Sequence, residues 1–306
     1  MSLKIIFMGT PDFAIPTLDI LLKSSHTIVK VYSQTPKQSK RGMLVEKTPI
    51  HVFAEKNNLQ VHTPSSLKAK EELEFLKNLR ADIAIVVAYG QIIPENFLEA
   101  LPHGFINIHG SILPKWRGAA PIQRAIMNGD KETGVSIMKI GKELDSGPVL
   151  LTEKVTLDDT KDYGEVGSIL SKLGADLIMK SLDMIEKNTN KFMEQDHSKA
   201  TYAKKITKED ELIHWNKKPS EIVRHVNALS PAPGAFINYK GEKIKIWKIK
   251  KHILTGNIGQ ALNDDLVIGC KEGSVEILKI QRPGKKIQDK KDFLLGFKIP
   301  KSSKLF

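Results

Sequence analysis

Residues 105–114 read Phe-Ile-Asn-Ile-His-Gly-Ser-Ile-Leu-Pro, and this stretch decides the fold class. Its first five residues favour a β-strand, in which Asn107 and His109 share one face because side chains alternate along a strand. The strand ends at Gly110, and Pro114 cannot donate a ladder hydrogen bond. An amide and an imidazole therefore emerge together at the carboxyl end of a strand, where open α/β sheets bind their ligands.

Apolar runs on the amino-terminal side of this stretch predict further strands of the same sheet. Residues 4–8 and 27–33 read as strands joined by a helix over 16–23, and residues 82–89 are apolar on both faces, which is typical of a central parallel strand. This β-α-β order predicts an α/β fold with a Rossmann-like, mostly parallel sheet and helices on both faces. The turn at 9–13 has one glycine and no Gly-x-Gly-x-x-Gly, so we expect no dinucleotide site.

The last hundred residues have a different pattern of predicted secondary structure. One helix is followed by short alternating segments, which predict a small antiparallel β-barrel with an OB-fold as the best match. The expected strands are 235–239, 243–251, 259–262, 266–271 and 274–281. We therefore expect a catalytic domain over 1–189, a polar linker over 190–206 and a basic second domain over 207–306.

Composition is ordinary for a globular protein, with 41% hydrophobic and 27% charged residues. No apolar run approaches the roughly 18 residues of a membrane span. The N-terminus leads directly into a strand and does not read as a signal peptide. The single cysteine, Cys270, cannot form an internal disulfide and reads as a core residue. We expect a cytoplasmic monomer without membrane partners.

Charge differs sharply between the two expected domains. Residues 1–189 hold 23 Lys and Arg against 22 Asp and Glu, whereas residues 207–306 hold 20 against 11. A nearly neutral first domain followed by a basic second domain indicates a catalytic domain joined to a module that binds a polyanion. The alternative explanation of the basic charge is an organism whose proteins are generally rich in lysine, but this would spread lysine over the whole chain.

Two loops are candidate binding segments. Residues 34–48 are polar, basic and aperiodic, and a loop of this length in a compact domain is usually functional or disordered. Arg41 and Gly42 at its middle could meet a phosphate or ribose, or the loop could simply be solvated. Residues 90–93 follow a predicted central strand, and their backbone could read a flat heterocycle between the side chains of Ile92 and Ile93.

Three polar side chains can meet at the carboxyl edge of the sheet. Asn107 and His109 end one strand, and Asp145 lies just before another. This set suits acyl transfer to an amine, because an amide NH₂ and a protonated imidazole can both donate to the oxyanion. The carboxylate would orient the imidazole, favour its charged form and help to remove the amine proton. Taken singly, each residue is also common as a satisfied polar group or a turn former.

Other chemistries have weaker support in the sequence. Ser111 could act as a nucleophile beside His109, but nothing requires a covalent intermediate. The histidines are scattered, and neither a His-x-x-x-His nor a Cys-x-x-Cys motif occurs, so we expect no metal site.

Residues 107–114, together with Leu144-Asp145-Ser146-Gly147 downstream, resemble the signature of the formyltetrahydrofolate-dependent formyltransferases. Ile112 stands where the Ser-Leu-Leu-Pro tail of that signature has its first leucine, a conservative departure. Residues 7–14, 115–123 and 229–235 resemble the branch of the family whose acceptor is methionyl initiator tRNA. The resemblance covers essentially the whole chain.

The resemblance implies roles for individual residues. Asn107, His109 and Asp145 match the catalytic trio of the family. The matches to its binding segments are Ser111, Ile112, Leu113 and Pro114 for tetrahydrofolate, Gly90, Gln91, Ile92 and Ile93 for the pterin, and Arg41 with Gly42 for the tRNA acceptor end. The basic second domain matches the tRNA-binding module.

The resemblance also implies the reaction, which is transfer of the formyl group of 10-formyltetrahydrofolate to the amino group of methionyl initiator tRNA, without a metal. One alternative is a formyltransferase acting on a sugar-nucleotide or ribonucleotide amine, against which the basic second domain argues. Another is a non-catalytic RNA-binding protein, against which the intact trio argues.

Overall fold

A computed structural model describes residues 2–38 and 45–305 of the protein. By its internal contacts the chain forms two compact units. The first unit comprises Met1–Gly118, Gly134–Val155 and Ser168–Tyr202, and the second comprises Ala119–Thr133, Thr156–Gly167 and Ala203–Phe306. The chain therefore passes between the units more than once, and each unit is built from separate stretches of sequence.

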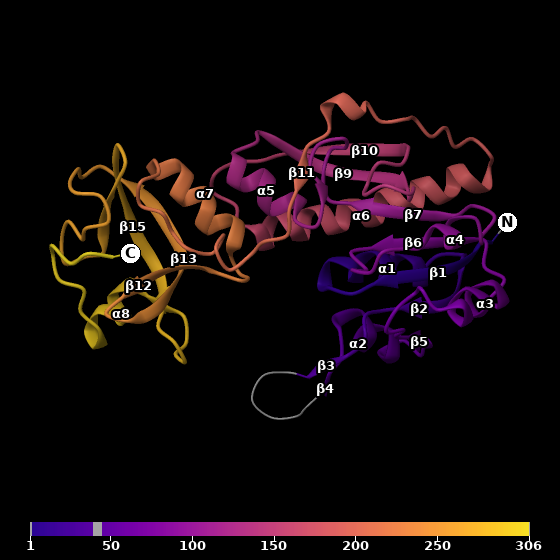
Figure 1. Ribbon diagram of the computed structural model, residues 1–306, viewed down its shortest axis with the longest axis horizontal. Helices are drawn as coiled ribbons and strands as arrows, with labels where there is room; N and C mark the ends of the chain where they lie inside the picture. Colours follow the sequence, from indigo (N-terminus) through magenta and orange to yellow (C-terminus); the bar gives the residue numbers. More distant parts are fainter. Residues whose placement is uncertain (1, 39–44, 306) are drawn as a thin grey trace. The chain divides into compact units, whose positions relative to one another are not determined.

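The first unit is built on a seven-stranded sheet with the order β10-β9-β7-β6-β1-β2-β5. Figure 1 shows these labels in that order from top to bottom. The strands are β1 Lys4–Gly9, β2 Thr27–Tyr32, β5 Val61–His62, β6 Ile83–Val87, β7 Phe105–His109, β9 Glu132–Lys139 and β10 Val149–Thr156. Pairing is parallel from β5 through β2, β1 and β6 to β7, and antiparallel between β7 and β9. The predicted α/β class with a mostly parallel sheet is confirmed.

Helices cover both faces of this sheet. They are η1 Asp12–Ala14, α1 Ile15–Leu22, α2 Pro49–Lys56, α3 Lys70–Asn78, α4 Glu95–Leu98 and α6 Tyr163–Glu186, with η2 His197–Lys199 further along. The helices α3 and α4 pack on the face that carries Met8 and Phe105. On the opposite face α6 approaches so closely that a Cβ at Gly174 would lie 2.6 Å from Ile108 Cγ2. Side chains of β7 that point away from Ile108 therefore lie on the α3 and α4 side.

Short strand pairs complete the first unit. Strand β3 (Lys37–Gln38) pairs antiparallel with β4 (Val45–Glu46), within a stretch where the sequence indicated no regular structure. Because each strand has only two residues, no period-2 pattern could reveal them. The predicted tRNA contacts Arg41 and Gly42 lie outside the described residues. Strand β8 (Arg117–Gly118) pairs with β11 (Tyr202–Ala203).

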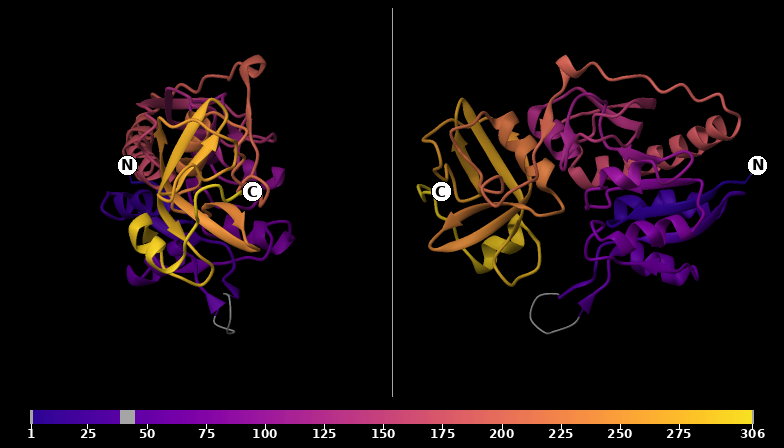
Figure 2. Two further views of the ribbon diagram at one scale, coloured as in Figure 1. Left: turned by 90° about the vertical axis from the view of Figure 1, so that its left-hand side faces the viewer. Right: turned by 45° about the vertical axis from the view of Figure 1, so that its right-hand side comes forward.

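The second unit holds a five-stranded antiparallel sheet that curls into a half-barrel, as Figure 2 shows from two sides. Its elements are α5 Pro121–Asn128, α7 Pro219–Leu229, β12 Ala235–Tyr239, β13 Glu242–His252, β14 Val267–Cys270, β15 Gly273–Gln281, β16 Gln288–Asp289 and α8 Lys290–Gly296. The strand order is β12-β13-β15-β14, and β16 pairs with β15. Apolar residues of α7, such as Val226, share one core with inward residues of the sheet, such as Ile246. The predicted small β domain after the α/β domain is confirmed.

Two details of this unit differ from expectation. The predicted strand over 259–262 is wrong, because Gln260 and Ala261 form isolated bridges to different partners, Lys304 and Ile268, and so build no ladder. Helix α8 was not predicted, because its seven residues fall in a lysine-rich stretch without a clear helical period.

Candidate active site

Strand β7 carries the first two candidate residues. Its register pairs Asn107 with Val86 on β6 and with Met138 on β9. Asn107 is half-buried and His109 is buried, and both lie on the α3 and α4 side of the sheet because they alternate with Ile108. The strand thus places an amide and an imidazole on one face at its carboxyl end, as the sequence predicted.

The His109 imidazole has a neighbouring polar group at each of its two nitrogens. Nε2 lies 3.0 Å from the Trp116 carbonyl oxygen. A carbonyl can only accept, so Nε2 carries the hydrogen of this bond. Nδ1 faces Asp145 Oδ2 at 3.7 Å, which is ion-pair distance for a protonated ring. The structure therefore brings His109 and Asp145 together, although they are 36 residues apart in the chain.

Asp145 lies in the connection between β9 and β10, and its carboxylate is fixed from the backbone. Gly118 N–H donates to Oδ2 at 2.7 Å. Asp145 has φ +47°, in the left-handed region that aspartate tolerates better than most residues. At Gly147 a Cβ would lie 2.0 Å from the Lys139 carbonyl oxygen, so only glycine allows the loop to pass this close to β9. The carboxylate is consequently presented to His109 by a tightly packed loop.

This arrangement suits transfer of an acyl group without a covalent enzyme intermediate. The Asn107 amide and a protonated His109 are hydrogen-bond donors, and Asp145 supplies a negative charge beside them. Ser111 is fully buried, and its hydroxyl donates to the Lys115 carbonyl at 2.6 Å, so this oxygen shapes a turn and is not presented as a nucleophile. Among residues 2–38 and 45–305, no group of three or more His, Cys, Asp or Glu side chains could hold a metal ion.

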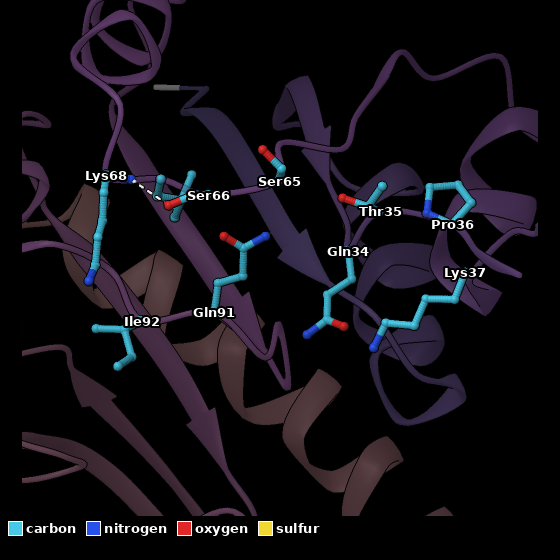
Figure 3. Close-up of a pocket in the computed structure, with 10 residues that line it drawn as sticks. Gln34, Thr35, Pro36, Lys37, Ser65, Ser66, Lys68, Gln91 and Ile92 are labelled. Carbon is cyan, nitrogen blue, oxygen red and sulfur yellow. Dashed lines mark hydrogen bonds between the residues drawn. The ribbon is translucent and has the colours of Figure 1, made fainter.

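The predicted folate-binding residues fall into two groups. Gln91 and Ile92 line a cavity of about 630 Å³ at the carboxyl ends of β2 and β5. Figure 3 shows it with the other lining residues, which include Gln34, Ser66 and Lys68. Gly90 has φ +84°, and its carbonyl oxygen accepts a hydrogen bond from Gln34 Nε2 at 2.9 Å. Ile93 does not line the cavity but packs into the core under α3 and α4.

The second group of predicted folate-binding residues, Ser111–Pro114, follows β7 and is more buried than the first group. Ser111 and Leu113 are buried, whereas Ile112 and Pro114 are half-buried. Leu113 N–H donates to Ser136 Oγ at 3.1 Å, which ties this segment to β9. Neither Ser111 nor Leu113 lines the cavity of Figure 3.

Sequence reasoning missed two residues that support the site. Arg117, which lies between Trp116 and Gly118 in the chain, is buried, and its guanidinium donates hydrogen bonds to the side-chain oxygen of Gln195. Gln195 is also buried, although the sequence placed it in a polar linker. The residues that its side chain bonds to are 48 to 78 positions away in the chain, and no local pattern marks such a contact.

The second unit presents basic and aromatic side chains on the outer face of its sheet. Lys243 Nζ lies 3.6 Å from the centre of the Phe236 ring, and Lys245 Nζ lies 5.3 Å from that of Trp247. Lys248 on β13 is directly opposite Lys279 on β15, and neither forms an ion pair with a described residue. Like charges opposite each other on neighbouring strands are unfavourable unless an anion binds them.

Comparison with known proteins agrees with these features. Residues 3–182 match the formyl transferase family model, and residues 205–298 match the formyl transferase C-terminal domain. The methionyl-tRNA formyltransferase of Pelagibacter ubique is 47% identical over 307 residues, which cover 100% of this chain and 99% of that protein. The chain belongs to the methionyl-tRNA formyltransferase family. The family member of Caulobacter vibrioides is 43% identical over 97% of this chain and 98% of its own length.

Solved structures share the fold of this family member at lower identity. A sugar 3N-formyltransferase, WlaRD, superposes with a TM-score of 0.67 at 20% identity, covering 94% of this chain and 100% of that one. HypX from Aquifex aeolicus in complex with tetrahydrofolic acid gives a TM-score of 0.63 at 17% identity, covering 96% of this chain and 47% of that one. Within the described part of the chain, no helix has the length and apolar character needed to cross a membrane.

Proposed function

We propose that this protein transfers the formyl group of 10-formyltetrahydrofolate to the α-amino group of methionyl initiator tRNA. The observation that carries the proposal is the His109–Asp145 pair, 3.7 Å apart at the carboxyl edge of the sheet, in a chain whose full-length relatives are named methionyl-tRNA formyltransferases. In the reaction the amine nitrogen bonds to the formyl carbon. The bond from that carbon to the folate nitrogen breaks, and the amine proton ends on the folate.

Asn107 and His109 are the proposed donors to the oxyanion. The Trp116 carbonyl occupies Nε2 of His109, so Nδ1 is the nitrogen that remains for a second proton. A proton there gives an imidazolium, whose charge the nearby Asp145 carboxylate stabilises. Preorganised donors of this kind can supply several kcal/mol of transition-state stabilisation.

Asp145 is the proposed acceptor of the proton that leaves the amine, directly or through a water molecule. An aminoacyl ester lacks the carboxylate charge of the free amino acid, so the pKa of its ammonium group is lower than in the free amino acid and lies near the ~7.7–8.0 of a peptide α-amino group. A useful fraction of it is therefore already a neutral nucleophile near pH 7. The protein mainly has to align it with the formyl carbon.

The binding segments complete the proposal. Residues Gly90–Ile93 and Ser111–Pro114 would hold the folate, because both follow strands that end at the edge where His109 lies. Arg41 and Gly42 would contact the acceptor end of the tRNA. The basic half-barrel would bind tRNA phosphates, with Lys248 and Lys279 as its best candidates. We further propose that the protein works as a monomer in the cytoplasm.

A formyl-transfer assay tests this function directly. The purified chain is incubated with 10-formyltetrahydrofolate and methionyl initiator tRNA, and N-formylmethionyl-tRNA is quantified. Parallel reactions contain a sugar-nucleotide amine or glycinamide ribonucleotide as the acceptor. Product only with the charged tRNA supports the proposal, product with a small amine identifies the alternative enzyme, and tRNA binding without any product identifies a non-catalytic RNA-binding protein.

A further inference from the structure

The buried amide of Gln195 connects the loop of Asp145 to the strand beside it. Its Nε2 donates to the Asp145 carbonyl at 2.9 Å and to the Gly147 carbonyl at 2.7 Å. Its Oε1 accepts from Arg117 Nε at 3.2 Å and from Arg117 Nη2 at 2.8 Å. All four hydrogen-bonding positions of one side-chain amide are thus directed at two segments of the candidate site.

The segment from Trp116 to Gly118 holds both proposed catalytic side chains, His109 and Asp145. The Trp116 carbonyl accepts from His109, and Gly118 N–H donates to the Asp145 carboxylate. Arg117, between them, extends its guanidinium to Gln195. The Asp145 side chain is therefore fixed by Gly118, and the Asp145 backbone is fixed by Gln195, which is bonded to Arg117 of the same segment.

We infer that Gln195 is a positioning residue for the transfer reaction, and this inference rests on the function proposed above. Gln195 sets the backbone of Asp145 and thereby the distance from the carboxylate to His109 Nδ1. It touches no reacting atom, so it acts through Asp145. Its partner Arg117 holds the amide in the one orientation that presents Nε2 to the loop.

Only a side-chain amide satisfies both neighbours of this position. The Asp145 and Gly147 carbonyls need a donor, and the guanidinium needs an acceptor. A glutamate at position 195 would still accept from Arg117, but its ionised oxygens would face two carbonyl oxygens. An alanine would leave the buried guanidinium without this partner, which is costly for the fold itself. The Gln195→Glu variant therefore separates positioning of the loop from support of Arg117.

Apart from Gln195, the middle of the loop is held by the bond from Gly118 N–H to the Asp145 carboxylate and by bonds from Ser146 to the Glu143 carbonyl within the loop. The Gln195 amide is the group that binds its backbone carbonyls at Asp145 and Gly147. Asp145 has a left-handed backbone conformation that costs on the order of 1 kcal/mol or more without compensating contacts. When the Gln195 donor is lost, we expect the loop over 141–148 to sample other conformations. A displacement of about 1 Å between groups that act together can reduce a rate about 100-fold.

The test measures full-length wild type, Q195E, D145N and the Q195E/D145N double variant in the formyl-transfer assay. We expect Q195E to lower kcat at least tenfold while the KM values for tRNA and folate change less than about threefold. We expect the double variant to be as slow as D145N alone, because Gln195 acts through Asp145. Glu194→Ala is the matched control, since Glu194 is the exposed neighbour of Gln195.

Amide hydrogen exchange over 141–148 gives a readout that does not depend on activity. Faster exchange there in Q195E, with unchanged exchange in β1 and β6, supports the inference. Unchanged exchange, a kcat equal to wild type, or losses that multiply in the double variant would overturn it. If Q195E does not fold, Gln195→Asn keeps the amide but withdraws it by one methylene, and the same comparisons apply. An inactive wild type would refute the proposed function, and the exchange data would then show only whether Gln195 fixes the backbone of the Asp145 loop.

Discussion

Gly118 donates its backbone N–H to the Asp145 carboxylate, with 2.7 Å between the nitrogen and Oδ2. The same Oδ2 lies 3.7 Å from His109 Nδ1, beyond the range of a direct hydrogen bond. The direction of the carboxylate is therefore set by the backbone at Gly118 before substrate binds. An aspartate fixed in this way is ready to stabilise an imidazolium or to accept a proton without first reorienting.

Asp145→Asn should lower turnover about 100-fold or more and leave tRNA affinity within about twofold. The asparagine keeps an oxygen for Gly118 N–H, so the loop stays in place, but it supplies no charge for the imidazolium and no base for the amine proton. Single-turnover formyl transfer and filter binding of tRNA measure the two effects. Glu143→Gln, an equal loss of charge on an exposed residue of the same loop, is the control. Turnover of D145N near that of E143Q would rule out the role of Asp145.

Much of the first unit follows from local sequence patterns. Helix α2 begins at Pro49, where Thr48 caps it by accepting from His51 N–H, and both residue types are favoured at helix starts. Strand β6 is buried at every position, in agreement with its unbroken apolar run. The meeting of His109 with Asp145 could also be anticipated, because both lie at the same edge of the sheet.

The contacts that complete the site could not be anticipated from such patterns. Gln195 bonds to Asp145 and Arg117 across stretches of the chain that carry no common period. The residues before and after it in the chain, Glu194 and Asp196, are charged and exposed, so the local composition indicates a solvated linker. The Trp116 carbonyl that holds His109 is a backbone group, which no residue-type pattern can reveal.

Arg41→Ala should raise the KM for methionyl initiator tRNA about tenfold and leave folate affinity unchanged. The expected size is that of one charge-assisted contact to phosphate, since about 1.4 kcal/mol corresponds to a factor of ten. Steady-state kinetics with each substrate varied in turn give both values. Arg80→Ala removes an exposed arginine that precedes β6 and should change neither. Equal kinetics for the two variants would assign Arg41 to a solvated loop with no role in tRNA binding.

Replacing Lys248 and Lys279 by alanine should weaken tRNA binding and flatten its dependence on salt. Each lysine that neutralises a phosphate contributes roughly 0.7–0.9 to the slope of log affinity against log salt, so the double variant should lose about 1.4–1.8 from that slope. Filter binding between about 50 and 200 mM salt measures it. Lys23 and Lys187 pair with acidic residues on helices of the first unit, so K23A/K187A is a control with the same loss of charge. A slope of K248A/K279A equal to that of this control would place the tRNA contacts elsewhere.

The stability of the second unit should fall as the pH drops from about 6.5 to about 4, and His225 on α7 should cause part of the loss. Burial lowers the pKa of this imidazole to about 4, and the nearby His214 and Arg124 act in the same direction, while a hydrogen bond to the Glu211 backbone and the Asp210 charge oppose them. The unfolded chain, with an ordinary histidine pKa of ~6.5, therefore binds the proton first. Within this window each fall in pH favours unfolding, and below about pH 4 the folded state is protonated as well and the loss stops.

The buried Nε2 of His225 has no hydrogen-bond partner among the described residues, so a proton there would be unsatisfied. The loss attributable to His225 is about 2–3 kcal/mol across the window. His225→Gln keeps a side chain that can donate to the Glu211 carbonyl but does not titrate. Urea unfolding at pH 7 and pH 4.5, followed by tryptophan fluorescence, to which Trp215 and Trp247 of the second unit and Trp116 of the first contribute, should show a smaller loss for this variant than for wild type. An identical loss in both proteins would mean that other groups carry the acid sensitivity of the second unit.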